Sequence, residues 1–374
     1  MSRCTPGPPA PADVAVLLVG PSSRIVGGQS VMAAELFRRM RGDGMSIDFL
    51  PIDPKPPGPL ALAERVKVLR TLVVSAFYCM SLLLQVRRYD VIHLFSASYL
   101  SFLISQMPPI LVARLYRKPL ILNYRSGEAE DHLRGASRGV FGLLRMCHAI
   151  VVPSGFLVQI FAQFGFRATA IANVVDPSVI HARHRGSARP RIIVPRALEP
   201  LYNVACAIRA FAIIQRRFPE ARFTILGKGS EEAVLKRLVH ELGLRHVEFS
   251  GWVDRSEIGE SYDRHDILVN TSSIDNMPVS LLEGFAAGLP IVTTNAGGIP
   301  YLARDRVNAH VVEVDDHEAI ASRVIELLEN PGEVSRLSRA GRQESQKYTW
   351  EAVAGQWYEL YSRIAAGEDA KSAA

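Results

Sequence analysis

Two carboxylates flank the start of an expected helix in the second half of the chain. Asp275 and Glu283 are separated by seven residues, and Asp275 follows a short apolar run at 267–269 that is typical of a buried parallel strand. The helix is expected to begin near Pro278, because proline suits the first helical turn, where a backbone N–H has no partner. Free N–H groups and the positive end of the helix dipole then lie between the two acids. This combination predicts a site for an anionic ligand that also carries hydroxyl groups.

Other segments could bind phosphate. An expected strand at 14–19 leads into a loop with the pair Gly27 and Gly28, which would let backbone amides approach a phosphate closely. Arg196 follows another expected strand, and a guanidinium can bind two phosphate oxygens at once. Lys228, in a turn between two glycines, could add positive charge. The alternatives are a purely structural turn for the glycine pair and solvated surface positions for the two cations.

Residues 266–300 resemble the donor site of family 4, or group 1, glycosyltransferases. These enzymes carry two glutamates separated by seven residues, and Asp275 and Glu283 take their places here. Two flanking pieces agree: Ala287-Gly-Leu-Pro-Ile-Val-Thr-Thr294 resembles the A-x-G-x-P-V-V run of the family, and Gly297-Gly-Ile-Pro300 resembles its G-G-x-P turn. An acid pair alone is a weak signal, because helices contain many carboxylates, but three linked pieces at the family spacing are specific. The alternative is a solvated acidic helix start.

The resemblance implies a role for each of these residues. Asp275 would hold hydroxyls of the transferred sugar, Glu283 would accept hydrogen bonds from the ribose hydroxyls, and Arg196 would hold the donor diphosphate. Gly27 and Gly28 match the glycine pair of the family. The backbone at the helix start would meet the sugar and the phosphates; these residues are Asn276, Met277, Pro278, Val279 and Ser280.

The chain departs from the family pattern at four positions. An aspartate replaces the first glutamate, an arginine replaces a histidine near the sugar, a tyrosine replaces a lysine that follows the phosphate-binding arginine, and a tyrosine follows the G-G-x-P turn in place of an acid. These positions are Asp275, Arg125, Tyr202 and Tyr301.

Arg125 lies just past the expected strand at 119–123. Arginine cannot act as a base at neutral pH, so a catalytic role for Arg125 would be to stabilise charge on the leaving phosphate or to bind an acidic acceptor. His93 and His132 are nearby in the sequence but do not match the histidine position of the family. We interpret both as structural histidines with satisfied hydrogen bonds.

Short apolar runs alternate with segments of helical period along the whole chain, which predicts α/β units with parallel sheets. The expected strands are residues 14–19, 46–51, 91–94, 119–123, 149–152, 168–172, 191–194, 222–226, 247–249, 267–269, 290–293 and 310–312. A polar linker at 181–190 would separate a Rossmann-like domain at 13–180, on the acceptor side, from a second at 191–348 for the donor.

The resemblance implies the GT-B architecture for this arrangement, in which two Rossmann-like domains face a central cleft. It also implies that the expected C-terminal helix at 349–366 crosses back to the N-terminal domain. The apolar residues Trp357, Leu360, Tyr361 and Ile364 are expected to share one face of that helix.

The net charge of +6 is distributed unevenly. Residues 1–180 carry 19 Lys and Arg against 11 Asp and Glu, or +8, whereas residues 181–374 carry 24 against 26, or −2. A basic first half predicts an anionic partner such as a membrane surface or a phosphorylated acceptor. Residues 71–86 are uncharged and flanked by arginines, but they are shorter than the ~20 residues of a spanning helix. This segment is either a core helix or a helix that rests on a membrane.

Several classes of site have no support in the sequence. Four scattered cysteines without C-x-x-C spacing predict neither disulfides nor a zinc site, and favour a reducing compartment. No D-x-D pair is present to hold a metal ion on a diphosphate, and no nucleic-acid-binding signature occurs. We therefore expect no metal and no cofactor, with a nucleoside-diphosphate sugar as co-substrate.

Together these features predict a cytoplasmic enzyme, working at the inner face of the membrane as a peripheral protein. It would be a metal-independent hexosyl- or related glycosyltransferase, and family resemblance implies retention of anomeric configuration. The acceptor hydroxyl would belong to a glycan, a lipid or a small molecule, with a lipid-linked or anionic acceptor consistent with the basic half. Two alternatives stay open: a nucleotide-sugar-binding protein with little or no transferase activity, and a GT-B sugar-nucleotide epimerase.

Overall fold

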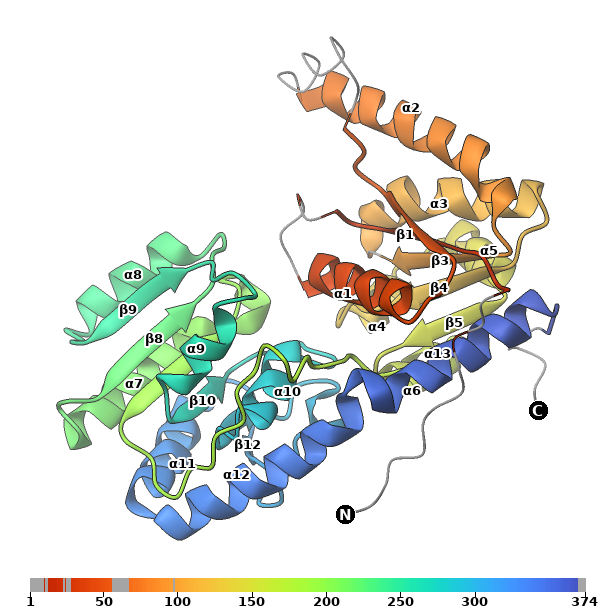
Figure 1. Cartoon of the computed structure of the whole chain (residues 1–374). Coiled ribbons are helices and arrows are strands. Elements are labelled where there is room, and N and C mark those ends of the chain that lie inside the picture. Colours follow the sequence, from red (N-terminus) through yellow and green to blue (C-terminus); the bar gives the residue numbers. More distant parts are fainter. Residues whose placement is uncertain are drawn as a thin grey trace. The chain divides into compact units, whose positions relative to one another are not determined.

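The protein comprises two compact α/β units (Figure 1). The structure is a computed structural model that describes residues 10, 13–22, 24, 28–55, 67–96 and 98–368. Unit 1 contains residues 1–172 and 353–374, and unit 2 contains residues 173–352. Each of the expected strands is present, with ends within two residues of the predicted ones. Most of them are apolar runs buried inside a parallel sheet, whereas the edge strands at 169–170 and 247–251 contain no buried residue.

Unit 1 is built on a six-stranded parallel sheet with the order β2-β1-β3-β4-β5-β6. All residues of β1, β3, β4 and β5 are buried, as expected for strands covered on both faces. The strands are β1 Val16–Gly20, β2 Ile47–Pro51, β3 Val91–Ser96, β4 Leu120–Tyr124, β5 Ala149–Val152 and β6 Thr169–Ala170.

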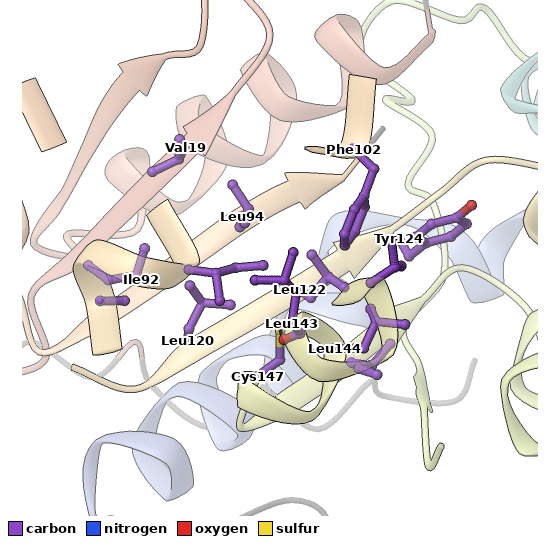
Figure 2. Packing of buried hydrophobic residues seen from close by; sticks show 14 of the residues in the cluster. Val19, Ile92, Leu94, Phe102, Leu120, Leu122, Tyr124, Leu143, Leu144 and Cys147 are labelled. Atoms are coloured by element: carbon purple, nitrogen blue, oxygen red, sulfur yellow. Dashed lines mark hydrogen bonds between the residues drawn. The ribbon is translucent and has the colours of Figure 1, made fainter. Parts of the chain in front are cut away.

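Helices connect these strands and cover the sheet. They are α1 Gly28–Gly42, α2 Lys67–Gln85, α3 Tyr99–Leu115, α4 Ala129–Arg134, α5 Arg138–Met146 and α6 Gly155–Gln163, with a short 3₁₀ turn, Val86–Arg88, after α2. Figure 2 shows one side of the core, where Leu94 and Leu122 from the strands meet Phe102 from α3 and Leu144 from α5. The core of unit 1 thus lies between the sheet and the helices on its face.

The C-terminal helix α13, Trp350–Ala365, joins unit 1 from Val353 onward. Its apolar face is the predicted one: Trp357, Leu360, Tyr361 and Ile364 are all at most 5% exposed. Tyr361 Oη lies 2.6 Å from Nδ1 of His93 on β3, and the Trp357 ring stacks on the same imidazole with centroids 4.9 Å apart. A buried polar contact therefore ties the end of the chain to the first sheet.

Unit 2 is built on a second six-stranded parallel sheet with the order β12-β11-β10-β7-β8-β9. The strands are β7 Arg191–Pro195, β8 Arg222–Leu226, β9 Val247–Gly251, β10 Ile267–Asn270, β11 Ile291–Thr294 and β12 His310–Val312. The helices are α7 Val204–Arg217, α8 Glu232–Glu241, α9 Ile258–Asp263, α10 Val279–Ala286, α11 His317–Glu329 and α12 Pro331–Ser345. Short 3₁₀ turns occur at Pro200–Tyr202, Ile299–Tyr301 and Gln346–Tyr348.

The polar segment 181–190, expected as a linker, lies within unit 2. Arg185 is only 2% exposed, and its guanidinium donates to the carbonyl oxygens of Tyr262 and His265 at 3.0 and 3.1 Å and to that of Ala287. The charge-rich composition of this segment suggests exposure, but the guanidinium of Arg185 is buried and its two Nη groups donate to backbone carbonyl oxygens.

The uncharged segment 71–86 forms most of α2 and is buried on one face only. Tyr78, Leu82 and Val86, spaced four residues apart, are at most 2% exposed and belong to the core of unit 1. Leu72 and Met80 are 63% and 57% exposed. Within the described ranges of the chain, no helix has both the length and the apolar character needed to cross a membrane.

The buried His93 should make stability depend on pH. Its burial, with a smaller effect of the Arg125 charge, lowers its pKa to about 3, so the folded protein keeps it neutral. The unfolded chain binds this proton below about pH 6.5. Acidification from pH 6 to 4 therefore favours unfolding, and this group should reduce the free energy of unfolding by at most about 1.4 kcal/mol per pH unit.

Urea denaturation at several pH values measures this slope. His93→Gln should give a shallower slope than the unchanged protein, whereas His240→Gln, at an exposed position on α8, should not change it. Equal slopes for His93→Gln and the unchanged protein would contradict the pKa of the buried imidazole.

Candidate active site

The loops that carry the predicted donor residues meet at one edge of the unit 2 sheet. All six strands are parallel, so their carboxyl ends lie along the same edge. β7 pairs with β8 on one side and with β10 on the other, so the strand order reverses beside β7. Crevices outside such a switch point are the usual ligand sites of open α/β sheets. Arg196 directly follows β7, and the loop at 271–278 follows β10.

The guanidinium of Arg196 is held on three sides. Its Nη2 donates to Oδ2 of Asp275 in an ion pair, and its Nη1 lies 3.5 Å from Oγ of Ser280. Cζ lies 3.9 Å from the centre of the Tyr202 ring, a cation–π contact. The side chains of Arg196 and Asp275 are only 10% and 12% exposed. The residues predicted to hold the diphosphate and the sugar are therefore brought together and bind each other.

Asp275 is fixed by its own loop and by the next one. Its Oδ1 accepts from the backbone N–H of Asn276 at 2.8 Å, and its Oδ2 accepts from Oγ of Ser272 at 3.3 Å. Its carbonyl oxygen accepts from the N–H of Gly298 at 3.0 Å. A Cβ on Gly298 would lie 2.2 Å from the carbonyl oxygen of Asn276, so only glycine allows this approach. The G-G-x-P turn thus packs directly against the backbone of the acidic loop.

The helix start has the predicted geometry. α10 begins at Val279. Pro278 precedes it as the N-cap residue with φ −65°, so the proline lies one residue before the first helical turn. Nδ2 of Asn173 donates to the carbonyl oxygen of the buried Met277 at 2.7 Å and holds the loop in place. Because the first N–H groups of a helix have no intrahelical partners, this end offers donors to an anion.

Glu283 lies one turn into α10 and is half-buried. Its Oε2 accepts from the hydroxyl of Tyr262 at 2.9 Å, which fixes the orientation of the carboxylate. Burial raises the pKa of Glu283, opposed by the Tyr262 hydrogen bond and by the charge of Arg255. Tyr262, on α9 and 1% exposed, is a contributor that the sequence motif does not reveal, because α9 is separate from the donor motif in sequence.

Lys228 is exposed and lies on the loop after β8, beside the Arg196 loop. Its carbonyl oxygen accepts from the N–H of Leu198 at 3.0 Å. A Cβ on Gly227 would lie 2.1 Å from the carbonyl oxygen of Arg196, and one on Gly229 would lie 2.3 Å from that of Leu198. The two glycines therefore let the loops after β7 and β8 pack backbone to backbone, which sets the position of Arg196.

The remaining predicted residues belong to unit 1. Gly28 is the first residue of α1, and a Cβ there would meet nothing within 4 Å; Gly27 lies outside the described residues. Arg125, half-buried after β4, donates from Nε to Oδ1 of Asn123 at 2.9 Å, and its Cζ lies 5.4 Å from the centre of the Phe95 ring. Burial lowers the pKa of Arg125 to about 10, so it is protonated at neutral pH.

His93 and His132 of unit 1 both have hydrogen-bond partners, as the sequence interpretation favoured. Nε2 of the buried His93 lies 2.9 Å from Nδ2 of Asn123, and Nδ1 contacts Tyr361. Nδ1 of His132 lies 2.9 Å from the hydroxyl of Tyr124, and burial lowers the pKa of His132. In the part of the chain that the structure describes, no group of three or more His, Cys, Asp or Glu side chains could hold a metal ion.

The comparisons with known proteins agree with the predicted family and fold. Residues 180–344 match the family model described as "Glycosyl transferases group 1". The "Putative glycosyltransferase EpsD" of Bacillus subtilis (strain 168) is 27% identical over 172 residues, which are 46% of this chain and 45% of that protein. The match thus spans about half the length of this relative.

Two solved structures share the fold. The sucrose-phosphate synthase from Thermosynechococcus elongatus is 17% identical with a TM-score of 0.75, over 95% of this chain and 100% of that chain. Anabaena HepE in complex with UDP-glucose is 16% identical with a TM-score of 0.73, over 93% of this chain and 99% of that chain. These matches confirm the GT-B fold with two parallel Rossmann-like sheets.

The ion pair between Arg196 and Asp275 should contribute to the stability of unit 2. Asp275→Asn leaves Arg196 without its counter-charge at a position nine-tenths buried, and should lower the free energy of unfolding by about 3 kcal/mol. The double variant Arg196→Met/Asp275→Asn removes both charges and should recover most of that loss.

Chemical denaturation of the single and double variants measures the coupling. The matched control is Glu232→Gln, which breaks the exposed pair with Lys236 on α8 and should change stability little. If the losses of the single variants Asp275→Asn and Arg196→Met simply add in the double variant, the buried pair is not coupled.

Proposed function

We propose that this chain, a distant member of the group 1 glycosyltransferase family, transfers a sugar from a nucleoside-diphosphate sugar to an acceptor hydroxyl, with retention of configuration. The observation that carries the proposal is the convergence of Arg196, Asp275 and the start of α10 at the switch point of the unit 2 sheet. A cation, a carboxylate and a helix N-terminus at one place suit a ligand that combines phosphates with hydroxyls.

Each donor group has a proposed place in this site. Arg196 binds the diphosphate as a bidentate cation, helped by the backbone amides at the start of α10. Glu283, oriented by Tyr262, accepts hydrogen bonds from the ribose hydroxyls. Asp275 accepts from the hydroxyls of the sugar. Lys228, exposed on the loop after β8, adds positive charge for the phosphates.

On this proposal, donor binding replaces the ion pair between Arg196 and Asp275 with contacts from each residue to the donor. The diphosphate takes the guanidinium of Arg196, so the carboxylate of Asp275 is released toward the sugar hydroxyls. Tyr202 keeps Arg196 in place during the exchange, because the ring contacts the face of the guanidinium and leaves its N–H edge for oxygen ligands.

The proposed chemical step is a front-face displacement. The bond from the acceptor oxygen to the anomeric carbon forms as the bond from that carbon to the phosphate oxygen breaks. The acceptor proton passes to the leaving phosphate oxygen, and a nucleoside diphosphate is released. The protein contributes by positioning and by charge stabilisation, and Arg125 supplies a cation for the leaving phosphate or an acidic acceptor. We propose that this chemistry proceeds without a metal ion.

Donor and acceptor identity are the finer part of the proposal. The fold match to HepE, whose structure contains UDP-glucose, supports testing uridine diphosphate hexoses first. The acceptor hydroxyl is proposed to belong to a glycan, a lipid or a small molecule, with a lipid-linked or anionic acceptor favoured by the +8 charge of residues 1–180. The same positive charge supports the proposal that the enzyme acts at the cytoplasmic face of a membrane.

A nucleotide-sugar-binding protein without turnover is the second candidate. The observation that favours it is the pairing of Arg196 with Asp275, since each proposed ligand group is already neutralised by the other. The two candidates differ in one result: both bind the nucleotide, but only the transferase releases nucleoside diphosphate in the presence of an acceptor.

A thermal-shift panel followed by a turnover assay tests the function. Uridine, guanosine and adenosine diphosphates and their hexose conjugates are added to the full chain. A ligand at 100 times its Kd should add about 2.7 kcal/mol to the stability of the folded state. The best donor then enters an assay for released nucleoside diphosphate with hydroxyl acceptors. Absence of any shift would overturn both candidates, and a shift without turnover would support the binding protein.

Asp275→Asn should separate the sugar role from the nucleotide role. The variant loses the carboxylate for the sugar hydroxyls, and turnover should fall by about 100-fold. Its affinity for the nucleoside diphosphate should be at least that of the unchanged protein, because the diphosphate no longer competes with a carboxylate for Arg196. Calorimetry and the release assay measure the two quantities. Weaker nucleotide binding would place Asp275 with the nucleotide instead.

Glu283→Gln should weaken nucleotide binding by about tenfold, because the amide loses the charge that strengthens the ribose hydrogen bonds. Glutamine keeps an oxygen acceptor for Tyr262, so the fold is spared. Tyr262→Phe is the converse variant, since it removes the hydrogen bond that Glu283→Gln keeps and leaves the carboxylate in place; it should weaken nucleotide binding less than Glu283→Gln does. Unchanged affinity in Glu283→Gln would remove this residue from the nucleotide site.

A further inference from the structure

The face of α2 that points away from the core is apolar and exposed. Leu72, Met80 and Leu84 are 63%, 57% and 59% exposed, and Ala76 lies on the same stripe at helical spacing. The opposite stripe, which includes Tyr78 and Leu82, is buried in unit 1. The helix is therefore apolar on two opposite faces, and only one of them is covered by the core of unit 1.

α3 repeats the pattern. Ile104, Met107, Leu111 and Leu115 are 51%, 40%, 46% and 68% exposed and are spaced three or four residues apart. Together the helices α2 and α3 carry most of the large apolar side chains that are exposed in the described part of the chain. Contiguous exposed apolar patches usually mark an interaction site.

The two helices lie side by side and run in the same direction (Figure 1). The hydroxyl of Tyr78 donates to the carbonyl oxygen of Ser105 at 2.9 Å, and further along both helices that of Tyr116 donates to the carbonyl oxygen of Leu83 at 3.0 Å. The carboxyl ends of the helices are thus adjacent. We call the exposed apolar residues Leu72, Met80, Leu83, Leu84, Leu103, Ile104, Met107, Leu111 and Leu115 the α2–α3 surface.

Cations gather at the shared carboxyl end of these helices. Arg87 and Arg88 follow α2, and Arg114, Arg117 and Lys118 end α3 or follow it. Residues 67–118 hold seven lysines and arginines against a single acid, Asp90. A cavity of about 320 Å³ opens at this end, lined by Arg114, Arg117, Lys118 and His148 together with apolar Ile110 and Met146.

We propose that the α2–α3 surface docks on a lipid bilayer that carries anionic headgroups. The apolar stripes would lie at the boundary of headgroups and acyl chains, parallel to the membrane plane, and the clustered cations would contact lipid phosphates. The basic cavity would take one phosphate-bearing headgroup, with its apolar wall toward the acyl chain. Neither helix is long and apolar enough to span, so the contact is peripheral.

The positive charge of residues 67–118 favours an anionic bilayer, rather than a second copy of this chain, as the partner of the α2–α3 surface. A symmetric pairing through the α2–α3 surface would bring the net charge of +6 on residues 67–118 of one copy against the same charge on the other. An anionic membrane offers the complementary sign over the whole surface. Docking needs no nucleotide, so its failure would leave the donor-site proposal untouched.

Sedimentation of the full chain with vesicles tests the proposal. Vesicles of phosphatidylcholine alone are compared with vesicles that also contain phosphatidylglycerol, and the mixed vesicles are repeated in 1 M salt, where the screening length falls to about 3 Å. The expected result is binding to the mixed vesicles that is largely lost in high salt. Equal binding to both vesicle types, or to neither, would overturn the proposal.

Two sets of variants locate the contact. Arg114→Gln, Arg117→Gln and Lys118→Gln should each weaken binding to the mixed vesicles about fivefold. Met80→Gln/Ile104→Gln/Leu111→Gln should weaken it further, since these side chains supply apolar contact; glutamine retains helix propensity. The matched controls lie on exposed helix positions of unit 2: Arg216→Gln and Arg237→Gln for charge, and Val234→Gln for apolar area.

Thermal melting confirms that each variant is folded before its binding is compared. Binding that is unchanged in both variant sets, or reduced equally by the controls, would overturn the assignment to this surface. Sedimentation velocity without lipid adds a further check: a dimer that the apolar variants dissociate would make the surface an interface between copies and overturn bilayer docking.

Discussion

The ion pair between Arg196 and Asp275 joins two loops that are far apart in the sequence, and a backbone hydrogen bond attaches a third loop to them. Arg196 leaves β7, Asp275 leaves β10, and Gly298 after β11 donates to the backbone of Asp275. Parallel strands bring these loops to one edge of the sheet, but the positions of the loops relative to each other depend on close backbone packing. Gly227 and Gly298 allow that packing, because a Cβ at either position would lie little more than 2 Å from a carbonyl oxygen. The glycines therefore set the geometry of the charged groups.

In unit 1 a row of hydrogen-bonded polar side chains positions Arg125, whereas in unit 2 an ion pair positions Arg196. Arg125 donates to Asn123, Asn123 contacts His93, and His93 contacts Tyr361 on the C-terminal helix. Burial keeps the imidazole of His93 neutral, so these hydrogen-bonded side chains position Arg125 without adding a second charge beside it. Helix α13 is thereby connected, through His93 and Asn123, to a residue that follows β4. Loss of a link in such a chain would leave buried polar atoms without partners, which is costly inside a core.

The amino-acid sequence was sufficient to predict the strands, because buried parallel strands are continuous apolar runs with turn residues around them. The helix start near Pro278 and the apolar face of α13 followed from local rules in the same way. The contacts of the site did not. Arg196 and Asp275 are 79 positions apart, and Tyr262 is 21 positions from Glu283, so their meetings depend on tertiary packing. Arg185 shows the same limit, since a segment rich in charge contains a guanidinium that is buried on backbone carbonyls. Exposure of one face of α2 likewise depends on which helix packs beside it.

Two departures from the family pattern become a single feature once their contacts are considered together. The resemblance to group 1 glycosyltransferases predicts a lysine at the position of Tyr202, and the ring of Tyr202 lies against the guanidinium of Arg196. A lysine at this position would place a second cation beside Arg196 and would compete for the carboxylate of Asp275. With a neutral ring there, Arg196 is the cation that meets Asp275, and a short side chain suffices because Asp275 is anchored to the N–H of Asn276 at its own backbone. Glutamate would carry its carboxylate about 1.5 Å further, roughly one C–C bond, and press against the arginine that Tyr202 already supports. The shorter acid and the aromatic ring therefore contact the same guanidinium, so each restricts which side chain fits at the position of the other.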